Sequence, residues 1–487
     1  MSKFFTRPLH RSATRFLTAA LLASACVQPW AQGKPQTPQP PADMRSAGRE
    51  ILKELVELRA VHSRGTTASA QFIAARLAAG GFASEDIHVL APEAHPEMGN
   101  VVVRLRGSGK NRPVLYIGHL DVVDARRDDW NVDPFVLTEK EGWLYGRGTI
   151  DMLGQNSAML AAVLRLKKEG FVPERDIIIA FTADEEAGEV ANGVNFLLTK
   201  HRALVDAGLA INPDAGEAAL KNGRQLYLGV QTSEKIYLTF SLEVTDKGGH
   251  GSRPTPANPI YRLSRGLGRL SGLEFPVRMT ATSKLYFAGR AKLESGQRKA
   301  DMLAVSGAAL GAAPGAAATA RLAQEVETNI MLRTTCTATE LHGGHAENAL
   351  PQRARATIQC RLIPGETQAS VQRALARTLA DPSIIISVMS PASPSPESAP
   401  TPAILQTLGA VMDQMWPGVA VIPTMSAGAS DSIHTRAAGI PTYGIDGMFD
   451  DLDDGRAHGR DERISVKVFD EDLEFTYRLM KAMSQMK

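Results

Sequence analysis

The stretch RDIIIAFTADEE, residues 175–186, joins an apolar run to three consecutive carboxylates, Asp184, Glu185 and Glu186. A short run that is apolar at nearly every position is typical of a strand buried on both faces of a mostly parallel sheet. In open sheets of this kind, binding sites form beyond the carboxyl ends of the strands. The stretch therefore predicts a buried strand that leads directly into a site rich in negative charge.

Strand-like and helical segments alternate on both sides of this stretch. The strand-like runs are NVVVRLRG, PVLYIGHLDVV and AGLAINPDAG, and the helical ones include NSAMLAAVLRLKKEG and GVNFLLTKH. Two amphipathic helices precede them, and the folded part is expected to begin near Met44. Such alternation is typical of a mostly parallel sheet covered by helices on both faces. We therefore predict an α/β fold around a mostly parallel central sheet.

The pattern changes at Ser233, where KIYLTFSLEVT alternates like a half-exposed strand and NPIYRLSRGLGRL follows a helical period. A further strand-like run, ARATIQCRLI, ends before Pro364, and helical patterns then resume. These features predict an α+β domain inserted into a discontinuous α/β domain. The predicted boundaries are residues 44–232 and 364–487 for the α/β domain and 233–363 for the inserted domain.

The first 31 residues have the three parts of a secretory signal peptide: the basic MSKFFTRPLHRSATR, the apolar FLTAALLASACV and the small-residue exit QPWAQG. The apolar part is too short to span a membrane, so cleavage near Ala31 predicts a periplasmic or secreted protein. Because LASAC also resembles a lipoprotein box, lipid anchoring through Cys26 is the alternative. Residues 32–43 are rich in Pro and Gln and are predicted to form a linker.

Composition excludes several classes of protein. The 487 residues carry a formal net charge of +2 and are 44% hydrophobic, which gives no electrostatic basis for binding nucleic acid. No further apolar run is long enough to cross a membrane, so no transmembrane span is expected in the mature chain. Beyond the signal, only Cys336 and Cys360 remain; they lie in strand-like runs and either pair across neighbouring strands or stay as buried thiols.

Histidine and carboxylate side chains recur where the strand-like runs end or in turns next to glycine. Taken singly, such a residue more often satisfies a core carbonyl or caps a helix than binds a metal. Taken together, they offer the nitrogen and oxygen ligands that zinc prefers, with enough carboxylates for a bridging ligand and a general base. The candidates are His119, Asp121, Asp151, Asp184, Glu185, Glu186, Asp214 and His458.

Six segments in order resemble the motifs of the di-zinc peptidases and amidohydrolases that include glutamate carboxypeptidase, aminoacylase and succinyl-diaminopimelate desuccinylase. The segments are GHLDVV, WNVDPFVLTEKEGWLYGRGTIDMLGQNSAML, FTADEEAG, GGHGSRP, HGGHAENALPQRARATIQCRLIPGE and AHGRDERI. The resemblance extends from about Met44 to the C-terminus. It implies a catalytic α/β domain with an inserted lid and dimerisation domain, and hence a homodimer.

The resemblance also assigns roles around the first zinc ion. His119 would bind it, and Asp121 would orient the imidazole through a hydrogen bond. Asp151 would bridge both ions. Relatives often carry Glu-Gly-Gly at the remaining ligand position, whereas this chain has Asp214-Ala-Gly, so Asp214 is the matching ligand and Glu217 is the alternative.

Around the second zinc ion, Glu186 and His458 would act as ligands. Glu185 would be the general base that activates the metal-bridged water. Asp184 receives no catalytic role. The expected cofactor is two Zn²⁺, with Co²⁺ or Mn²⁺ as alternatives for the native metal.

In the inserted domain, the resemblance implies three contacts with substrate. His250, in GGHGSRP, would stabilise the oxyanion of the scissile carbonyl, often across a dimer interface. Asn348 would contact the substrate. Arg361 would pair with the free carboxylate of the substrate, a bidentate interaction that a guanidinium suits. The structural alternatives are an Asn in a turn and an Arg on an exposed strand.

The predicted function is hydrolysis of a peptide bond, or another amide bond, next to a free carboxylate. A carboxypeptidase is the first interpretation, and an N-acyl-amino-acid amidohydrolase of the aminoacylase type is the second. A catalytically silent binding protein is a third, which the presence of Glu185 disfavours. Substrates would be small peptides or N-acyl amino acids, and the loop with Ser426, Gly428 and Asp431 would shape the specificity pocket.

Overall fold

The computed structural model describes residues 37–187, 191–308, 315–393 and 395–486. The predicted signal peptide, with Cys26, and residues 32–36 of the predicted linker lie outside the described residues. Residues 37–487 form one compact unit. None of the helices in the described ranges is both long enough and apolar enough to cross a membrane.

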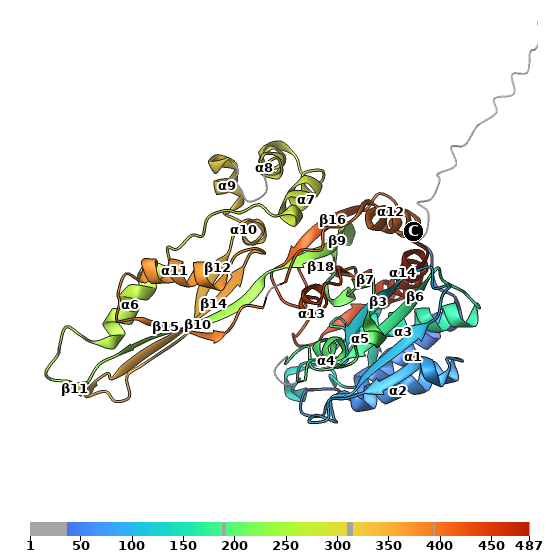
Figure 1. The fold of residues 1–487 in the computed structure, drawn as a ribbon, viewed down its shortest axis with the longest axis horizontal. Helices are drawn as coiled ribbons and strands as arrows, with labels where there is room; N and C mark the ends of the chain where they lie inside the picture. Colours follow the sequence, from blue (N-terminus) through green and yellow to red (C-terminus); the bar gives the residue numbers. More distant parts are fainter. Residues whose placement is uncertain (1–36, 188–190, 309–314, 394, 487) are drawn as a thin grey trace, which may run out of the picture. The chain divides into compact units, whose positions relative to one another are not determined.

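A six-stranded sheet forms the centre of the α/β part (Figure 1). Strand β6 lies between β2 and β3, and it is parallel to β3 and antiparallel to β2. Strands β3, β7 and β17 are parallel neighbours. In sheet order the strands are β1 (Ile87–Leu90), β2 (Asn100–Leu105), β6 (Arg175–Thr182), β3 (Asn111–His119), β7 (Leu209–Ile211) and β17 (Thr442–Tyr443).

Both faces of β6 are buried, as the apolar run predicts. Ile177, Ile179 and Phe181 face one hydrophobic core, whereas Ile178 and Ala180 face another on the opposite side of the sheet. The first core is covered by α1 (Ala42–Leu58), α2 (Thr67–Ala79), α3 (Leu153–Lys168), α12 (Pro402–Met415) and α14 (Val466–Gln485). The second is covered by α4 (Gly193–Lys200) and α5 (Arg202–Val205), and α13 (Ser432–Ala437) packs against α4 and β17.

Two smaller sheets adjoin the central one in the α/β part. A four-stranded sheet has the order β16 (Ala420–Ser426), β9 (Arg224–Glu234), β8 (Glu217–Lys221) and β18 (Phe449–Asp451). A three-stranded sheet has the order β19 (Arg463–Ser465), β5 (Trp143–Tyr145) and β4 (Thr138–Lys140). Each sheet pairs strands that are far apart in the chain, β9 with β16 in the first and β5 with β19 in the second. Long-range contacts therefore determine these sheets.

The inserted part is built on a four-stranded antiparallel sheet with its own hydrophobic core. Its strands, in order, are β12 (Thr335–Gly343), β14 (Arg353–Leu362), β10 (Ile236–Thr245) and β15 (Ile385–Ser390). Helices α6 (Pro259–Leu270) and α11 (Gln368–Leu379) pack on it through that core. A two-stranded ribbon joins β11 (Gly249–His250) to β13 (Ala349–Leu350).

The boundary that the sequence predicts after Ile363 separates elements that pack together. Helix α11 contributes Val371 and Leu375 to the core of the inserted sheet, and β15 pairs with β10. The chain therefore returns to the α/β part only after β15. An amphipathic helix and a short strand have the same pattern in either domain, so the period of the sequence does not reveal which sheet they join.

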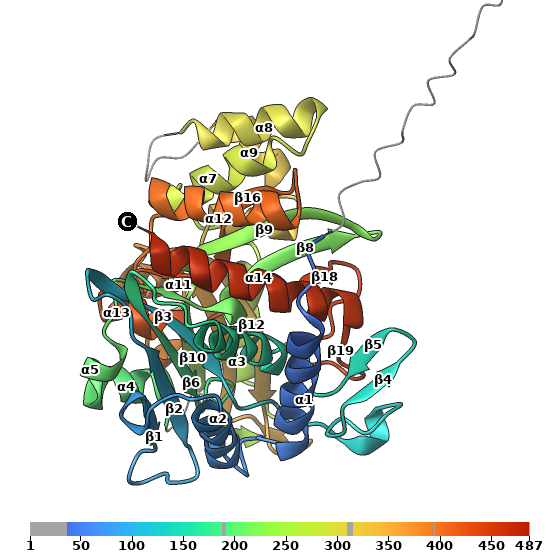
Figure 2. The same ribbon diagram turned by 90° about the vertical axis from the view of Figure 1, so that its right-hand side faces the viewer.

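Four further helices of the insertion pack on the sheet that contains β9 and β16 (Figure 2). Their shared core contains Phe287 and Met302 from the helices and Ile422 from β16. The helices are α7 (Ala281–Arg290), α8 (Gly296–Ser306), α9 (Ala316–Leu322) and α10 (Val326–Leu332). The segment between β10 and β12 thus contacts both the inserted sheet and the sheet of β9.

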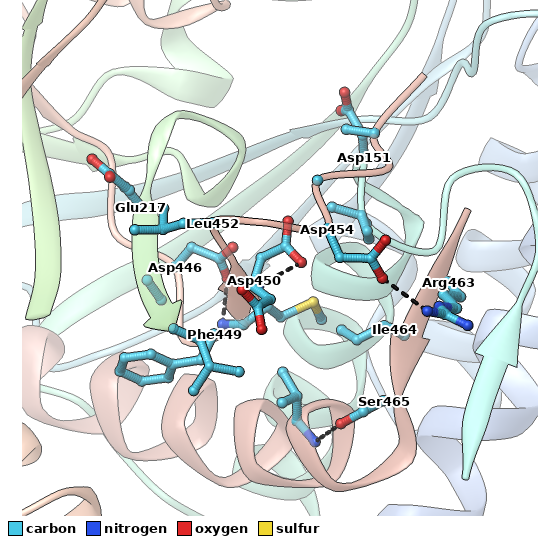
Figure 3. Close-up of a pocket in the computed structure, with 18 of the residues that line it drawn as sticks. Asp151, Glu217, Asp446, Phe449, Asp450, Leu452, Asp454, Arg463, Ile464 and Ser465 are labelled. Atoms are coloured by element: carbon cyan, nitrogen blue, oxygen red, sulfur yellow. Dashed lines mark hydrogen bonds and ion pairs between the residues drawn. The ribbon is translucent and has the colours of Figure 1, made fainter. Parts of the chain in front are cut away.

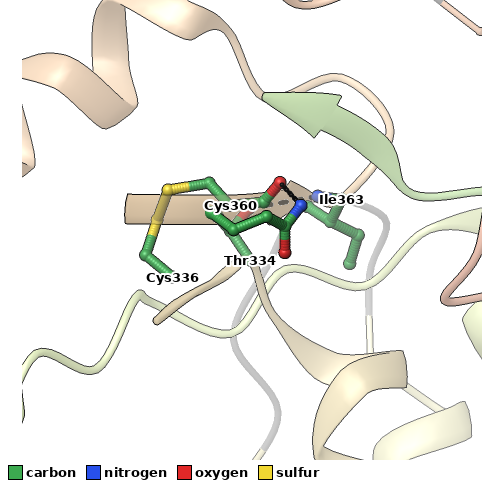
Figure 4. The surroundings of a disulfide bond; sticks show 5 residues. Thr334, Cys336, Cys360 and Ile363 are labelled. Carbon is green, nitrogen blue, oxygen red and sulfur yellow. Dashed lines mark hydrogen bonds between the residues drawn. A yellow bond between two sulfur atoms is a disulfide. The ribbon is translucent and has the colours of Figure 1, made fainter. Parts of the chain in front are cut away.

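Cys336 and Cys360 form a disulfide bond with an S–S distance of 1.98 Å (Figure 4). They are directly opposite each other on the antiparallel strands β12 and β14. The sequence leaves open whether these cysteines pair or stay as buried thiols, and the structure contains the disulfide. The bond closes a loop between residues 24 positions apart and ties the edge strand β12 to its neighbour.

Candidate metal centre

Three predicted ligands meet at the carboxyl ends of the central strands. His119 ends β3, Glu186 follows β6, and Asp151 lies just before α3. Their ligand atoms all lie within 4.8 Å of one another. Because β3 and β6 are parallel neighbours, with His119 paired to Thr182, the sheet itself brings His119 and Glu186 together.

The carboxylate of Asp151 lies between two imidazoles. Its Oδ1 is 3.1 Å from Nε2 of His119, and its Oδ2 is 3.0 Å from Nε2 of His458. The same nitrogen of His458 is 2.9 Å from Oε1 of Glu186. One carboxylate that offers a separate oxygen to each of two histidines has the arrangement that a bridging metal ligand needs.

Asp214, in the turn after β7, is the acidic residue beside His119. Its Oδ1 is 3.9 Å from Nε2 of His119. Glu217, the alternative ligand, instead accepts a hydrogen bond from the Tyr227 hydroxyl at 2.6 Å. In Figure 3 the Glu217 side chain points away from Asp151. The geometry therefore favours Asp214 over Glu217.

The contacts of Asp121 differ from the predicted ones. Nδ1 of His119 donates to the backbone carbonyl oxygen of Asp121 at 2.9 Å, whereas the Asp121 carboxylate is 3.9 Å away. That carboxylate accepts the backbone N–H groups of Glu185 at 3.2 Å and Glu186 at 3.0 Å. Because a carbonyl only accepts, the neutral imidazole carries its proton on Nδ1 and keeps a lone pair on Nε2. Asp121 thus orients His119 through its backbone and the acidic turn through its side chain.

The turn after β6 separates the three carboxylates. Asp184 adopts a left-handed backbone conformation with φ of 60° and is fully buried. Its Oδ2 accepts the backbone N–H of Ala191 at 2.8 Å, and its Oδ1 is 3.2 Å from Nδ1 of His62. Asp184 therefore anchors the turn, and Glu185 and Glu186 project from it toward the centre.

The centre holds more negative charge than its own side chains neutralise. Burial raises the pKa of Glu185 to about 10, and the charges of Asp214 and Asp431 add to this effect although His119 opposes it. Burial likewise raises the pKa of Asp214 to about 7. Hydrogen bonds to Asp151 and Glu186 raise the pKa of His458 to about 10.

This donor set fits divalent metal ions. Two imidazoles and several carboxylates are the nitrogen and oxygen ligands that zinc and its first-row neighbours take. Bound cations would offset the crowded negative charge and reverse the upward pKa shifts. The five residues that would hold the ions are His119, Asp151, Glu186, Asp214 and His458.

Glu462 is a supporting residue that the candidate set omits. Its side chain accepts the backbone N–H groups of Ile150 at 2.8 Å and Asp151 at 3.2 Å, and it pairs with Arg147 at 2.6 Å. Glu462 and Arg147 are both buried, so this pair fixes the backbone that carries the bridging carboxylate. The sequence feature that could have identified Glu462 is its place in the segment AHGRDERI, four residues after His458.

The loop after β16 contributes one residue to the centre. Asp431 accepts hydrogen bonds from Asn192 at 2.6 Å and from the Thr182 hydroxyl at 3.3 Å, which places it at the end of β6. The Ser426 hydroxyl instead accepts the backbone N–H of Gly428 at 3.0 Å. Of the three residues that the sequence assigns to a pocket, only Asp431 contacts the strand end next to Glu185.

The three predicted substrate contacts lie on the inserted part. The ribbon of β11 and β13 brings His250 close to Asn348, whose carbonyl oxygen accepts the Gly251 N–H at 2.7 Å. Both residues are exposed. The Arg361 guanidinium lies 4.7 Å from the centroid of the Tyr237 ring, and its buried Nη1 has no hydrogen-bond partner among the described residues. None of the three bonds to the metal centre within the described ranges.

Comparison with known proteins agrees with this geometry. The model of the peptidase family M20/M25/M40 matches residues 115–482. The chain belongs to this family. It is 28% identical over 383 residues to the probable carboxypeptidase S-like 2 of Dictyostelium discoideum, covering 76% of this chain and 71% of that protein. It is 27% identical over 382 residues to the human N-fatty-acyl-amino acid synthase/hydrolase PM20D1, covering 76% and 74% of the two chains.

The fold also matches a solved member of the family. The metallo-carboxypeptidase Sso-CP2 of Sulfolobus solfataricus superimposes with a TM-score of 0.64 at 17% sequence identity, over 90% of this chain and 99% of that chain. At this identity the match establishes the fold alone. The chain is therefore a metallopeptidase-family hydrolase with a mixed α/β architecture.

Proposed function

We propose that the protein is a di-zinc hydrolase that cleaves a peptide or N-acyl amide bond next to a free carboxylate. The observation that carries the proposal is the Asp151 carboxylate between His119 and His458, with Glu186 and Asp214 beside them. The carboxypeptidase-like and N-acyl-amino-acid hydrolase names of the two relatives support amide hydrolysis.

In the proposed reaction, bound zinc would polarise the substrate carbonyl and lower the pKa of the attacking water. Glu185 takes a proton from that water and returns it to the nitrogen of the leaving amine. The turn held by Asp121 and Asp184 directs Glu185 toward the centre. His250 donates a hydrogen bond to the oxyanion that develops on the carbonyl.

Arg361 is the proposed partner of the free carboxylate on the leaving group, and Asn348 the proposed additional substrate contact. The Nη1 atom of Arg361 is buried without a hydrogen-bond acceptor among the described residues, and a substrate carboxylate would supply one. Carboxypeptidase and N-acyl-amino-acid substrates both carry this carboxylate. Peptides remain the first choice, and N-acyl amino acids are the second.

The decisive experiment compares free and blocked carboxylates. The zinc-loaded protein would be assayed on a panel of dipeptides, N-acyl amino acids and the corresponding C-terminal amides. We expect cleavage of the free acids only, and Arg361→Met should reduce kcat/KM for them by about 10- to 100-fold. Arg355→Met, on the same strand β14, is the matched control. Equal cleavage of acids and blocked amides would refute the carboxylate requirement.

We further propose a periplasmic or secreted location and a homodimer formed through the inserted part. The signal-like N-terminus and the Cys336–Cys360 disulfide support an oxidising compartment. The exposed position of His250 supports a contribution from a second subunit to the site. Measuring the solution mass together with activity tests this: a fully active monomer would remove the cross-subunit role of His250.

A further inference from the structure

A cavity of about 590 Å³ opens beside the metal centre (Figure 3). Asp151 and Asp214, two of the proposed metal ligands, are part of its lining. Further parts of the wall come from β8, from residues 446–457 with β18, from β19, from Trp143 on β5, and from residues of α3 and α14. The volume is in the range of pockets that bind small molecules. A group attached to a carbonyl at the metal centre can therefore extend into this cavity.

Aliphatic and aromatic side chains form one part of the wall. Met448, Phe449 and Ile464 are each at most 5% exposed, and Leu452 and Val468 complete this surface. Such a surface favours contact with the methylene groups of a ligand through burial of apolar area.

Carboxylates form another part of the wall, and they differ in their partners. Asp454 is neutralised by Arg456 and Arg463, each at 2.8 Å. Asp446 instead accepts from the Gln155 side chain at 3.2 Å and from a backbone N–H, and Asp450 accepts the backbone N–H of Asp451. Neither Asp446 nor Asp450 pairs with a lysine or arginine among the described residues. The cavity therefore offers negative charge that the chain does not neutralise.

Two further observations indicate a donor-bearing ligand. Gln155 lines the cavity, is 4% exposed, and leaves its Oε1 without a hydrogen-bond partner within the described residues. Burial raises the pKa of Asp446 to about 7, so this carboxylate is held where a cation would stabilise its charged form. Asp450 is an exposed side chain of the same wall. An acceptor-rich wall of this kind complements an ammonium or guanidinium group.

An uncharged alkyl chain is the competing occupant. It would fit the apolar surface but would remove water from Asp446 and Asp450 without replacing their lost hydrogen bonds. Covering unpaired carboxylates in this way is costly, whereas a cation at the end of the chain offsets the cost. The charge of the wall therefore favours an aliphatic chain that ends in a cation.

We propose that this cavity is a specificity pocket for an aliphatic side chain with a terminal positive charge, as in lysine or arginine, on the acyl side of the scissile bond. The inference rests on the proposed amide hydrolysis. The acyl side follows because the free carboxylate is assigned to Arg361 on β14, and no residue of β14 lines the cavity. The methylene groups contact Met448 and Phe449, and the cation lies against Asp446, Asp450 and Gln155.

The first test measures binding without turnover. Zinc-loaded Glu185→Gln protein would be titrated by calorimetry with Nα-acetyl-lysyl-alanine, Nα-acetyl-norleucyl-alanine and decanoyl-alanine. Norleucine matches lysine without the amine, so the comparison isolates the charge. We expect the lysyl compound to bind about 10- to 100-fold more tightly than the norleucyl one. Equal or tighter binding of the norleucyl or decanoyl compound would overturn the proposal.

The second test assigns the preference to the cavity. In the same Glu185→Gln background, Asp450→Asn should reduce the lysyl-to-norleucyl affinity ratio to about one. Asp453→Asn is the matched control, because Asp453 is in the same loop but pairs with Lys221 and does not line this cavity. If both variants retain the wild-type lysyl-to-norleucyl affinity ratio, the cavity does not bind the positive charge of the ligand.

Turnover of the three compounds by the wild-type enzyme distinguishes failure of the proposed amide hydrolysis from failure of the proposed specificity pocket. Cleavage of all three without a preference for lysine would leave amide hydrolysis standing and refute the pocket. Selective binding of the lysyl compound without any cleavage would retain the pocket and refute the proposed reaction.

Discussion

Two buried clusters of charge in the α/β part differ in how they are neutralised. Glu234, at the end of β9, is fully buried and lies 2.9 Å from the guanidinium of Arg436. It also accepts hydrogen bonds from the hydroxyls of Ser395 at 3.3 Å and Ser430 at 3.0 Å. The metal centre instead collects Glu185, Asp214 and their acidic neighbours, and neither Glu185 nor Asp214 pairs with a lysine or arginine among the described residues.

The difference distinguishes a structural cluster from a binding site. The Glu234–Arg436 cluster contains its own cation and enough donors, so it stabilises the packing around the start of the inserted part without any ligand. At the candidate metal centre, burial and the charges of neighbouring carboxylates raise the pKa values of Glu185 and Asp214, and bound cations would offset this charge. Buried charge alone does not indicate a binding site. A site is indicated where buried carboxylates outnumber the cations that could pair with them and are arranged as metal ligands.

The largest expected effect comes from removing the proposed base, Glu185, from the unbalanced cluster. Glu185→Gln should lower kcat for amide hydrolysis by about 10²- to 10⁴-fold, because the water loses its proton acceptor. Zinc content, measured by atomic emission, should stay at the wild-type level. Glu57→Gln, at a position on α1 that forms an exposed ion pair with Lys53, is the control. Unchanged hydrolysis by Glu185→Gln would remove the proposed mechanism.

The second effect concerns the balanced cluster. Glu234→Gln should lower the free energy of unfolding by about 3–5 kcal/mol, because Arg436 would keep a buried charge without its partner. Glu274→Gln, which breaks the pair of Arg333 with a side chain that is 80% exposed, should change it by less than about 1 kcal/mol. Urea denaturation measures both values. Equal losses in the two variants would mean that burial does not distinguish these pairs.

A third prediction tests the charge imbalance without metal. In chelator-treated protein at pH 8, Asp214→Asn should raise the free energy of unfolding by roughly 2 kcal/mol, because a buried carboxylate in a crowded site is neutralised. With zinc added, the wild type should be the more stable of the two, since the variant lacks a proposed metal ligand. Thermal unfolding with and without zinc provides the measurement. A metal-free variant that is less stable than the wild type would contradict the imbalance.

The smallest effect, when measured over one pH unit, concerns Lys235, the residue between β9 and β10. It is buried, its Nζ donates to the Arg333 carbonyl at 2.6 Å, and burial lowers its pKa to about 7 from 10.5. Between pH 7 and 10.5 the unfolded chain therefore holds a proton that the folded chain lacks, so stability rises with pH in this window.

Lys235→Met should remove this contribution. The difference in free energy of unfolding between wild type and variant should shift in favour of the wild type by at most about 1.4 kcal/mol per pH unit from pH 7 upward. Lys247→Met, at a position on the loop before β11, is the control. Parallel pH profiles for wild type and Lys235→Met would show that this lysine stays charged.

Several features follow from local sequence. The run from Ile177 to Phe181 has no polar residue, so it forms a strand covered on both faces. A parallel sheet then places His119 and the acidic turn at the same edge. Local pattern therefore suffices to predict the strand, its class of fold and the residues that gather at its end.

Other features depend on contacts between distant segments. The partner of the Asp121 carboxylate is the backbone of Glu185 and Glu186, more than 60 positions away, which spacing within GHLD does not reveal. Glu462 reaches the backbone of Asp151 across 311 positions. Helix α11 joins the inserted sheet although its amphipathic pattern would suit either domain.

The sequence by itself determined the α/β class, the buried strand β6 and the set of histidines and carboxylates, because hydrophobic period and residue chemistry are local properties. Only the tertiary structure decided that Asp151 lies between His119 and His458, that Asp214 rather than Glu217 is beside His119, and that Cys336 bonds to Cys360. It also decided that the buried carboxylate of Glu234 pairs with Arg436. These outcomes depend on distances between segments far apart in the chain, and such distances are determined by packing.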